Sequence, residues 1–337
     1  MGRTRLRRSD LRGPGIRRIR RGRGFSYVES DGSPVTDDEL LARIKDLVIP
    51  PAWRNVWICP YPNGHVQAVG TDDAGRRQYL YHEQWRRDRD EEKHDRVLAM
   101  ARRLPGWRES VAADLAGRGL TRKRVLAAAL RMLDRGIFRT GGEEYADENG
   151  THGVATLLRE HASVRGDECR FSYVAKGGLD REVAIRDAAL ASVVKSLLRS
   201  RSGSDRLLVY RDGDTWHEVH AADINERFKE LAGEDCTAKD LRTWTATVLA
   251  AAAVAAAAPP TSETARKRAE AGVMREVSRA LGNTPAVCRA SYVDPRLVEA
   301  YRGERTIAPA LKRVARLEGD EARAALEKAC ARLLKAS

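Results

Sequence analysis

The hydrophobic period of the chain changes near residue 85, and this change limits the possible fold more than any other feature. Residues 25–81 are short alternating runs separated by Gly, Pro, Asn and Asp, a pattern typical of β-strands and turns. From about residue 89, apolar side chains recur every three or four positions, as on amphipathic helices. A charged stretch, 86–95, separates the two patterns. The sequence therefore predicts a small mainly β domain, 25–88, and a larger mainly helical domain, 89–337.

In the first domain, one short helix at 36–45 interrupts the predicted strands. The last strand, RRQYLY, carries basic and aromatic side chains that suit phosphate and groove contacts, although tyrosine-rich strands are also common in cores. Strand alternation predicts two faces, with Arg76, Gln78 and Leu80 on one and Arg77, Tyr79 and Tyr81 on the other.

The larger domain is predicted to be helical around a three-stranded β-meander, which makes the whole chain α+β. The meander consists of LLREHASV, CRFSYVAK and REVAIRD. A short helix and loop are expected within 138–153. The alanine-rich run 246–258 ends at two prolines and indicates a buried helix. The other helices are predicted at 89–103, 107–117, 121–134, 187–200, 222–232, 238–256, 262–281, 295–302 and 318–335, with a hairpin near LLVYRDGDTWHEV.

Positive charge indicates the partner. The chain has 61 Lys and Arg against 48 Asp and Glu, a net charge of +13, so a polyanion is expected. Nucleic acid is the first choice and an anionic membrane surface the rival, but no apolar run reaches the ~18 residues of a spanning helix. Residues 1–24 contain ten arginines and one aspartate, which predicts a flexible arm that either binds phosphates or is simply solvated.

Cysteine and histidine usage bears on compartment and on metals. The five cysteines form no CxxC pair, and the histidines lack the spacing of metal ligands. The N-terminus shows no apolar signal segment. We therefore expect a cytoplasmic protein without a disulfide framework and without a metal site.

Tyr292 is the most informative single residue. Gly282 ends a long helical pattern, Thr284 and Pro285 can begin a short helix, and another helix follows, so Tyr292 is expected at the end of the short one. A phenol has a pKa of about 10 and becomes a nucleophile among cations or beside a base. The alternative is a buried aromatic residue with a satisfied hydroxyl.

Four other side chains could supply those charges and donors. Arg139 precedes a pair of glycines, where backbone could approach a ligand closely. Arg242 lies in the second turn of a helix that begins with a capping box, and burial would require a carboxylate or a phosphate as its partner. Lys176 lies in a hairpin turn and is either solvated or a proton donor. Asn283 follows a helix-ending glycine and either stabilises the turn or donates to an oxyanion.

Several motifs together resemble type IB DNA topoisomerases, most closely the compact bacterial and poxvirus-like branch. The resemblance covers about residues 15–305 and is highly specific because five motifs occur in order. It implies a DNA breaking-rejoining fold, with the two domains forming a C-shaped clamp around duplex DNA. The motifs are IPPAWRNVWICPYPNGHVQAVGTDDAGRRQYLYH, FRTGGEEY, AKGG, KDLRTW and LGNTPAVCRASY.

The resemblance also implies roles for the site residues. Tyr292 would be the nucleophile that forms a 3′-phosphotyrosine, Arg139 and Arg242 would hold the non-bridging oxygens, and Lys176 would protonate the leaving 5′ oxygen. Asn283 stands where the family usually has histidine. The DNA contacts of the first domain would come from Arg76, Gln78, Tyr79 and Tyr81.

The resemblance further implies that neither ATP nor a metal is needed, that one copy suffices, and that the protein works at the nucleoid. Two alternatives remain open from the residues. A tyrosine site-specific recombinase shares the catalytic residue types but usually has a helical N-terminal domain. A non-catalytic DNA-architectural protein would bind DNA without a covalent adduct.

Overall fold

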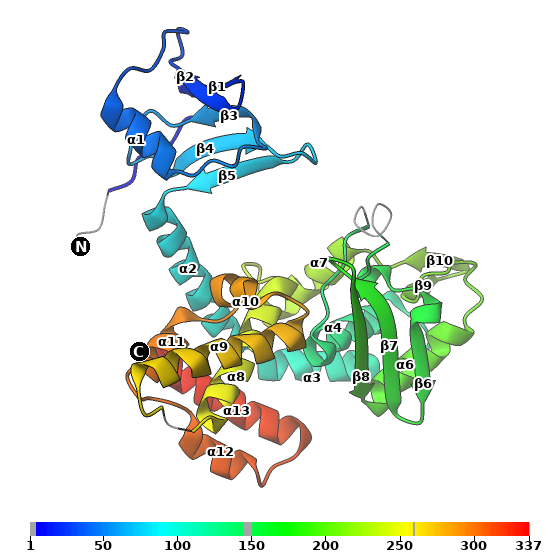
Figure 1. Cartoon of the computed structure of the whole chain (residues 1–337). Helices are drawn as coiled ribbons and strands as arrows, with labels where there is room; N and C mark the ends of the chain where they lie inside the picture. Colours follow the sequence, from blue (N-terminus) through cyan, green and yellow to red (C-terminus); the bar gives the residue numbers. More distant parts are fainter. Residues whose placement is uncertain (1–4, 144–149, 259, 337) are drawn as a thin grey trace. The chain divides into compact units, whose positions relative to one another are not determined.

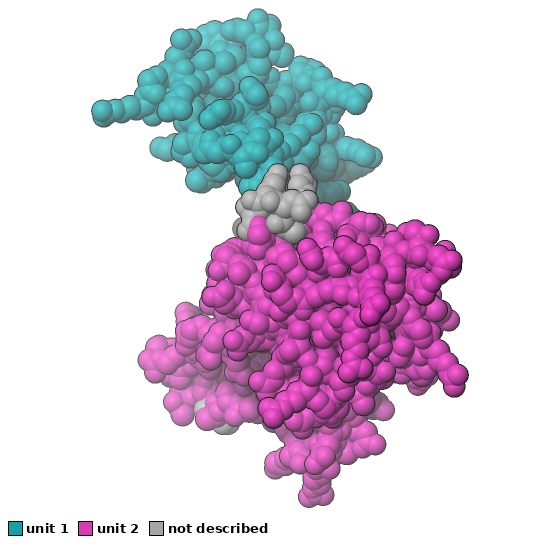
Figure 2. Space-filling view, turned by 90° about the vertical axis from the view of Figure 1, so that its right-hand side faces the viewer, with its two compact units in different colours: residues 1–93 teal, residues 94–337 magenta. Residues whose placement is uncertain are grey.

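The computed structural model describes residues 5–143, 150–258 and 260–336. The chain divides into two compact units, residues 1–93 and 94–337, which are coloured separately in Figure 2. The first is built on a β-sheet and the second is mainly helical (Figure 1). The predicted α+β class is therefore confirmed. The short helix and loop expected within 138–153 fall partly on 144–149, outside the described residues.

The first unit is a five-stranded antiparallel sheet in the order β2-β1-β3-β4-β5 with one helix, α1 (Asp38–Asp46). Asp37 caps α1 by accepting hydrogen bonds from two backbone N–H groups of its first turn. Ile44 of α1 is buried in a small apolar core with residues of the sheet. The strands are β1 (Ile16–Arg21), β2 (Gly24–Val28), β3 (Arg54–Ile58), β4 (Val66–Thr71) and β5 (Arg77–Tyr81).

The prediction that residues 1–24 form a flexible arm was wrong for β1. This strand pairs with β2 and β3, and Ile16 is fully buried. Arg18 donates hydrogen bonds to the carbonyl oxygens of Ile49, Pro50 and Trp53, at 3.1, 3.0 and 2.7 Å. The many arginines concealed a strand in which Arg18 satisfies backbone acceptors and Ile16 enters the core.

The second unit carries most of the helices near their predicted positions. α8 confirms the predicted buried helix, since most residues of its alanine-rich half are enclosed. One helix, α12, was not predicted. The helices are α2 (Glu83–Ala101), in which the division between the units falls, α3 (Leu104–Leu115), α4 (Arg122–Gly136), α6 (Ala188–Arg199), α7 (Ala221–Ala232), α8 (Ala238–Ala256), α9 (Glu263–Leu281), α10 (Pro285–Ser291), α11 (Pro295–Arg302), α12 (Ala308–Val314) and α13 (Gly319–Lys335).

The predicted meander is present as β6 (Ala162–Arg165), β7 (Glu168–Ala175) and β8 (Leu179–Arg186), an antiparallel sheet in chain order. Alternate side chains of β7 are buried, and this face of the sheet packs against α4 and α6 (Figure 1). A separate hairpin, β9 (Val209–Asp212) and β10 (Thr215–Glu218), was also predicted.

A buried ionic cluster joins the last helix to the core of the second unit. The Asp134 carboxylate on α4 accepts from Arg108 of α3 at 3.0 Å and from Arg323 of α13 at 2.6 Å. Arg108 also binds Glu327 of α13 at 2.8 Å. Burial would raise the pKa of Asp134, but the two guanidinium charges hold this pKa below its ordinary value. Each charge in this Asp134 cluster therefore faces an opposite charge.

Candidate active site

Tyr292 lies at the C-terminal end of α10, as predicted. Thr284 caps this helix, and Pro285 takes its first position. The Tyr292 N–H donates to the carbonyl of Cys288 at 3.0 Å, while the Thr247 hydroxyl of α8 donates to the Tyr292 carbonyl at 3.3 Å. The tyrosine is 6% exposed. Its backbone is thus held between two helices, and its side chain sits at the border of the core.

Arg242 on α8 is buried with no carboxylate beside its guanidinium in the described residues. It donates to the carbonyl oxygens of Ile137 and Leu281, the latter at 2.9 Å. Ile137 has a left-handed backbone, with φ 54°, an uncommon and strained conformation for a β-branched residue. The sequence left a carboxylate or a phosphate as the partner. Neutral carbonyls position the guanidinium instead and leave its charge uncompensated.

The same site contains Arg139 and Asn283. The Arg139 guanidinium donates to the side-chain oxygen of Asn283. Asn283 follows Gly282, whose φ of 63° ends α9 in a Schellman motif, and the Asn283 N–H donates to the carbonyl of Ser278 at 3.0 Å. Asn283 therefore both caps the helix and holds an arginine. The two predictions made for it from the sequence are compatible.

Gly141, two positions after Arg139, has a structural role. Gly141 has φ 88° and packs against the backbone of Gly153, where an added Cβ would lie 2.9 Å from the Gly153 Cα. The carbonyl of Arg139 accepts from Val154 N–H at 2.9 Å. These contacts bring backbone close to backbone, so Gly141 fixes the segment that carries Arg139, while the predicted approach of a ligand stays a prediction.

Two buried donors in the site have no acceptor among the described residues, namely Nε of Arg242 and Nδ2 of Asn283. Burial raises the pKa of the Cys288 thiol, and the nearby Asn283 amide opposes that rise. No acceptor in the described residues meets Asn283 Nδ2 with hydrogen-bond geometry. Buried donors without a partner are uncommon and costly in folded proteins. Unfilled donors beside an uncompensated guanidinium indicate a place for an oxyanion.

The charges of the site act on the Tyr292 hydroxyl. Burial is the largest single influence and would raise the pKa of Tyr292, but the effects of Arg242, Arg139 and Lys239 together outweigh it and bring the pKa below its ordinary value of 10. The Arg242 guanidinium carbon lies 5.6 Å from the Tyr292 ring centroid. In turn, burial and then the charge of Arg139 lower the pKa of Arg242 to about 10.

Lys176 lies on the exposed turn between β7 and β8. Gly177 and Gly178 follow it with φ of 87° and 70°, values that favour glycine, and Gly178 N–H closes the turn on Ala175 at 3.1 Å. The predicted hairpin position is thus confirmed. Its role as proton donor remains a prediction.

Three residues near the site were missed from the sequence. Lys239 lies three positions before Arg242 on α8, and its charge also lowers the pKa of Tyr292. The helical spacing of three could have drawn attention to it. Tyr173 and Arg181 belong to β7 and β8; burial raises the pKa of Tyr173, and the charges of Arg181, Arg242 and Arg139 oppose that rise. That proximity arises from the packing of the meander and could not be inferred from sequence.

In the first unit, the predicted alternation of the last strand is confirmed. Tyr79 and Tyr81 are about two-fifths exposed, and their rings stack with centroids 5.9 Å apart. Arg76 precedes β5 and pairs with Asp72 at 3.0 Å, and Gln78 donates to the same carboxylate at 2.9 Å. The DNA contacts of these residues remain a prediction.

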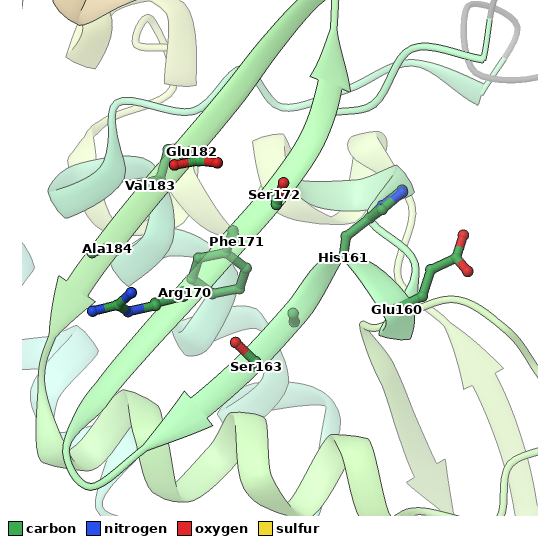
Figure 3. Close-up of a pocket in the computed structure, with 10 residues that line it drawn as sticks. Glu160, His161, Ser163, Arg170, Phe171, Ser172, Glu182, Val183 and Ala184 are labelled. Carbon is green, nitrogen blue, oxygen red and sulfur yellow. The ribbon is translucent and has the colours of Figure 1, made fainter.

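A hollow of about 440 Å³ opens on the meander (Figure 3), but it is not the predicted site. Its lining includes Glu160, Glu182 and Arg170, and it contains none of the predicted catalytic residues. Two carboxylates make it poorly suited to a phosphate. None of the helices in the described part of the chain has both the length and the apolar character needed to cross a membrane.

Together, the fold and the site define a class. A β unit followed by a helical unit that places a tyrosine among guanidiniums with unfilled donors is the arrangement of a DNA breaking-rejoining enzyme. Residues 24–72 match the family model for the bacterial DNA topoisomerase IB N-terminal domain, and residues 82–313 match the eukaryotic DNA topoisomerase I catalytic core. The chain belongs to the type IB DNA topoisomerase family.

Individual relatives agree with this assignment. The chain is 29% identical to DNA topoisomerase 1B of Acanthamoeba polyphaga mimivirus over 296 residues, 86% of this chain and 88% of the relative. It is 23% identical to DNA topoisomerase 1B of Vaccinia virus (strain Copenhagen) over 238 residues, 69% and 72% of the two chains. It is also 24% identical to DNA topoisomerase 1 beta of Arabidopsis thaliana over 160 residues, 47% of this chain and 16% of the relative.

Proposed function

We propose that this chain relaxes supercoiled DNA by cutting one strand through Tyr292, letting the free end swivel, and rejoining the strand. The observation that carries this proposal is the set of unsatisfied charges and donors beside Tyr292. A phosphodiester would fill them with its non-bridging oxygens. Those oxygens gain negative charge in the transition state, where fixed donors stabilise them most.

The reaction exchanges one phosphate ester for another. The Tyr292 phenol loses its proton to water, and its oxygen attacks the phosphorus in line. The bond from phosphorus to the 5′ oxygen breaks, the electron pair stays on that oxygen, and Lys176 supplies its proton. The product is a 3′-phosphotyrosine and a 5′-hydroxyl. Because the energy of the broken bond is kept in the new ester, rejoining is the same step in reverse, and neither ATP nor a metal is required.

In this reaction Arg139 and Arg242 hold the non-bridging oxygens, and Asn283 donates its free N–H to one of them. The amide lacks the charge that a protonated histidine would have. Charged donors form stronger hydrogen bonds. Asparagine is therefore expected to stabilise the transition state by about 1 kcal/mol less than a protonated histidine would, which lowers the rate several-fold.

The first unit is proposed to contact the duplex through the exposed aromatic face of β5, Tyr79 and Tyr81, together with Arg76 and Gln78. The last two are held by Asp72 in the structure. A DNA phosphate would have to compete with this carboxylate for Arg76. One copy of the chain carries all the proposed catalytic groups, so we propose a monomer that binds DNA in the nucleoid.

The site chemistry alone would also suit a tyrosine recombinase. That alternative predicts reaction at particular sequences, whereas the proposed enzyme relaxes plasmids of arbitrary sequence. An architectural protein predicts binding with no covalent adduct. Both family models that match the chain describe topoisomerase domains, which favours relaxation.

Relaxation of a supercoiled plasmid in EDTA without ATP tests the proposal. Wild-type protein should relax the plasmid, and Tyr292→Phe should be inactive because the nucleophile is gone. Tyr301→Phe is the matched control, since Tyr301 is also buried, 5% exposed, and its hydroxyl has no hydrogen-bond partner in the described residues. Loss of activity in both variants, or in neither, would contradict the proposed role of Tyr292.

A further inference from the structure

We propose that Arg181 is a positioning residue, which joins the hairpin carrying Lys176 to the end of α9 that carries Asn283. This inference rests on the proposed function, because it concerns how the proton donor is positioned relative to the side chains that donate hydrogen bonds to the phosphate. Arg181 does not have to touch DNA in order to act. Its effect reaches the reacting atoms through Lys176.

The first contact of Arg181 is with α9. Its guanidinium donates to the carbonyl oxygens of Ala280 at 3.0 Å and of Arg279 at 3.3 Å. These are carbonyls of the last turn of the helix, where the backbone leaves acceptors free and the helix dipole favours a cation. The packing is tight, since a Cβ added to Gly282 would lie 3.3 Å from Arg181 Nη1. Asn283 is the next residue of the chain.

The second contact of Arg181 is within the hairpin. Arg181 on β8 stands opposite Tyr173 on β7, where burial raises the pKa of the Tyr173 hydroxyl and the charge of Arg181 opposes that rise. Tyr173 is 7% exposed, and its ring stacks on Phe138 with centroids 5.5 Å apart. Phe138 precedes Arg139 directly. The pair Tyr173 and Arg181 therefore links three segments, which carry Arg139, Lys176 and Asn283.

The link bears on the position of Lys176. This lysine is in an exposed turn with two glycines, at the end of the two strands that Arg181 connects to α9. Proton transfer requires the ammonium within hydrogen-bond distance of the leaving oxygen, and a misplacement of about 1 Å can cost ~100-fold in rate. Releasing the hairpin from α9 should therefore slow the step that needs the proton more than it weakens DNA binding.

The experiment compares two leaving groups in single-turnover cleavage of a duplex whose cleavage site has been mapped with wild-type protein. One duplex has the ordinary 5′ oxygen and the other a 5′ sulfur at the scissile bond. A thiolate leaves without being protonated, because a thiol has a pKa of about 8.5. The variants are Arg181→Gln, Tyr173→Phe, Lys176→Ala and the double variant Arg181→Gln with Lys176→Ala.

Arg186→Gln is the matched control. Arg186 lies on the same strand but pairs with Asp167 and Glu168 at the opposite end of the hairpin. It should cleave both duplexes at the wild-type rate. Thermal unfolding and DNA affinity are measured for every variant. These measurements show whether slower cleavage comes from unfolding or weaker DNA binding, or from the chemical step itself.

We expect Arg181→Gln to cleave the oxygen duplex ~10- to 100-fold more slowly and the sulfur duplex at nearly the wild-type rate. Tyr173→Phe should show a smaller loss in the same direction. The double variant should be no slower than Lys176→Ala alone, since both changes remove the same step.

Two results would overturn the proposal while leaving the proposed function intact. In one, sulfur restores Lys176→Ala but not Arg181→Gln. In the other, the two losses multiply in the double variant. If Lys176→Ala itself cleaves the oxygen duplex at the wild-type rate, then the proton-donor role in the proposed function is wrong, and the positioning role is overturned with it.

Discussion

Two groups of buried or half-buried arginines in the second unit differ in which groups surround their charges. In the Asp134 cluster, Arg108 and Arg323 bind carboxylates at 2.6 to 3.0 Å. In the candidate active site, Arg242 binds the carbonyl oxygens of Ile137 and Leu281. Opposite charges raise the pKa of Arg108 despite its burial, while burial and the charge of Arg139 lower the pKa of Arg242 to about 10. In the Asp134 cluster the arginine charges are balanced by carboxylates, whereas no carboxylate of the described residues pairs with Arg242.

This difference has a cost that points to function. The fall of the Arg242 pKa from 12.5 to about 10 corresponds to ~3 kcal/mol of unfavourable interaction. Because the pKa of a cation is lowered by folding, the cost is fully present below pH 10, hence at neutral pH, and fades as the pH rises towards 12.5. Binding of a phosphate would relieve it. The carboxylate-paired arginines of the Asp134 cluster therefore stabilise the fold, whereas Arg242 keeps its charge for a ligand.

The largest expected effect comes from exchanging one arginine in each group for glutamine. Arg242→Gln should slow DNA cleavage ~100-fold or more, because a donor to the transition-state oxyanion is lost, with little loss of stability since an uncompensated charge is also removed. Arg108→Gln should instead destabilise the fold by about 3 kcal/mol, because Asp134 and Glu327 lose a partner. Single-turnover cleavage at low temperature and thermal unfolding measure the two effects. If both variants lost mainly stability, the distinction between the groups would fail.

A smaller effect is expected at Asn283. Asn283→Ala should slow cleavage by ~10-fold or more because the free N–H donor is lost. Asn283→His should raise the rate several-fold, at a pH where the imidazole is protonated, because a charged donor is stronger. Single-turnover cleavage at saturating protein separates these changes from DNA binding. Equal cleavage rates for wild type and Asn283→Ala would show that Asn283 does not contribute to the reaction.

The smallest expected effect concerns Lys239, whose charge lowers the pKa of Tyr292 without a proposed phosphate contact. Removing a cation raises the pKa of a nearby phenol, so in Lys239→Gln the rise of the cleavage rate with pH should shift to higher pH. The plateau rate should change little. Lys239→Arg is the control and should keep the wild-type profile. An unchanged profile in Lys239→Gln would show that this lysine does not act on the tyrosine.

Local patterns predicted most of the fold. The helices predicted to begin at 121 and 187 do begin there, next to Thr121 and Asp187, whose side chains accept hydrogen bonds from the first turns of α4 and α6. Strand β1 was missed because one of its charged side chains, Arg18, finds backbone acceptors in Ile49, Pro50 and Trp53, which no local pattern encodes. The composition correctly shows that these residues are basic, but the flexible arm predicted from it is wrong for the strand β1.

The residues of the site could be predicted from the sequence, but their hydrogen-bond partners could not. Tyr292, Arg139, Arg242 and Asn283 were selected from motifs, and the structure brings these four together. That Arg242 is held by carbonyls instead of a carboxylate depends on how α4 and α9 end beside α8. Such long-range packing leaves no periodic signal in the sequence.

The central claim is that uncompensated arginines hold a phosphate for attack by Tyr292, and trapping the covalent product tests it most directly. Wild-type protein is mixed with a duplex in which the strand beyond the cut is too short to remain paired, so that rejoining fails, and the denatured complex is digested and mapped by mass spectrometry. We expect one adduct, on Tyr292 and at a DNA 3′ end, that disappears in Arg242→Gln at early times. No adduct, an adduct on Tyr301, or linkage to a 5′ end would contradict the account.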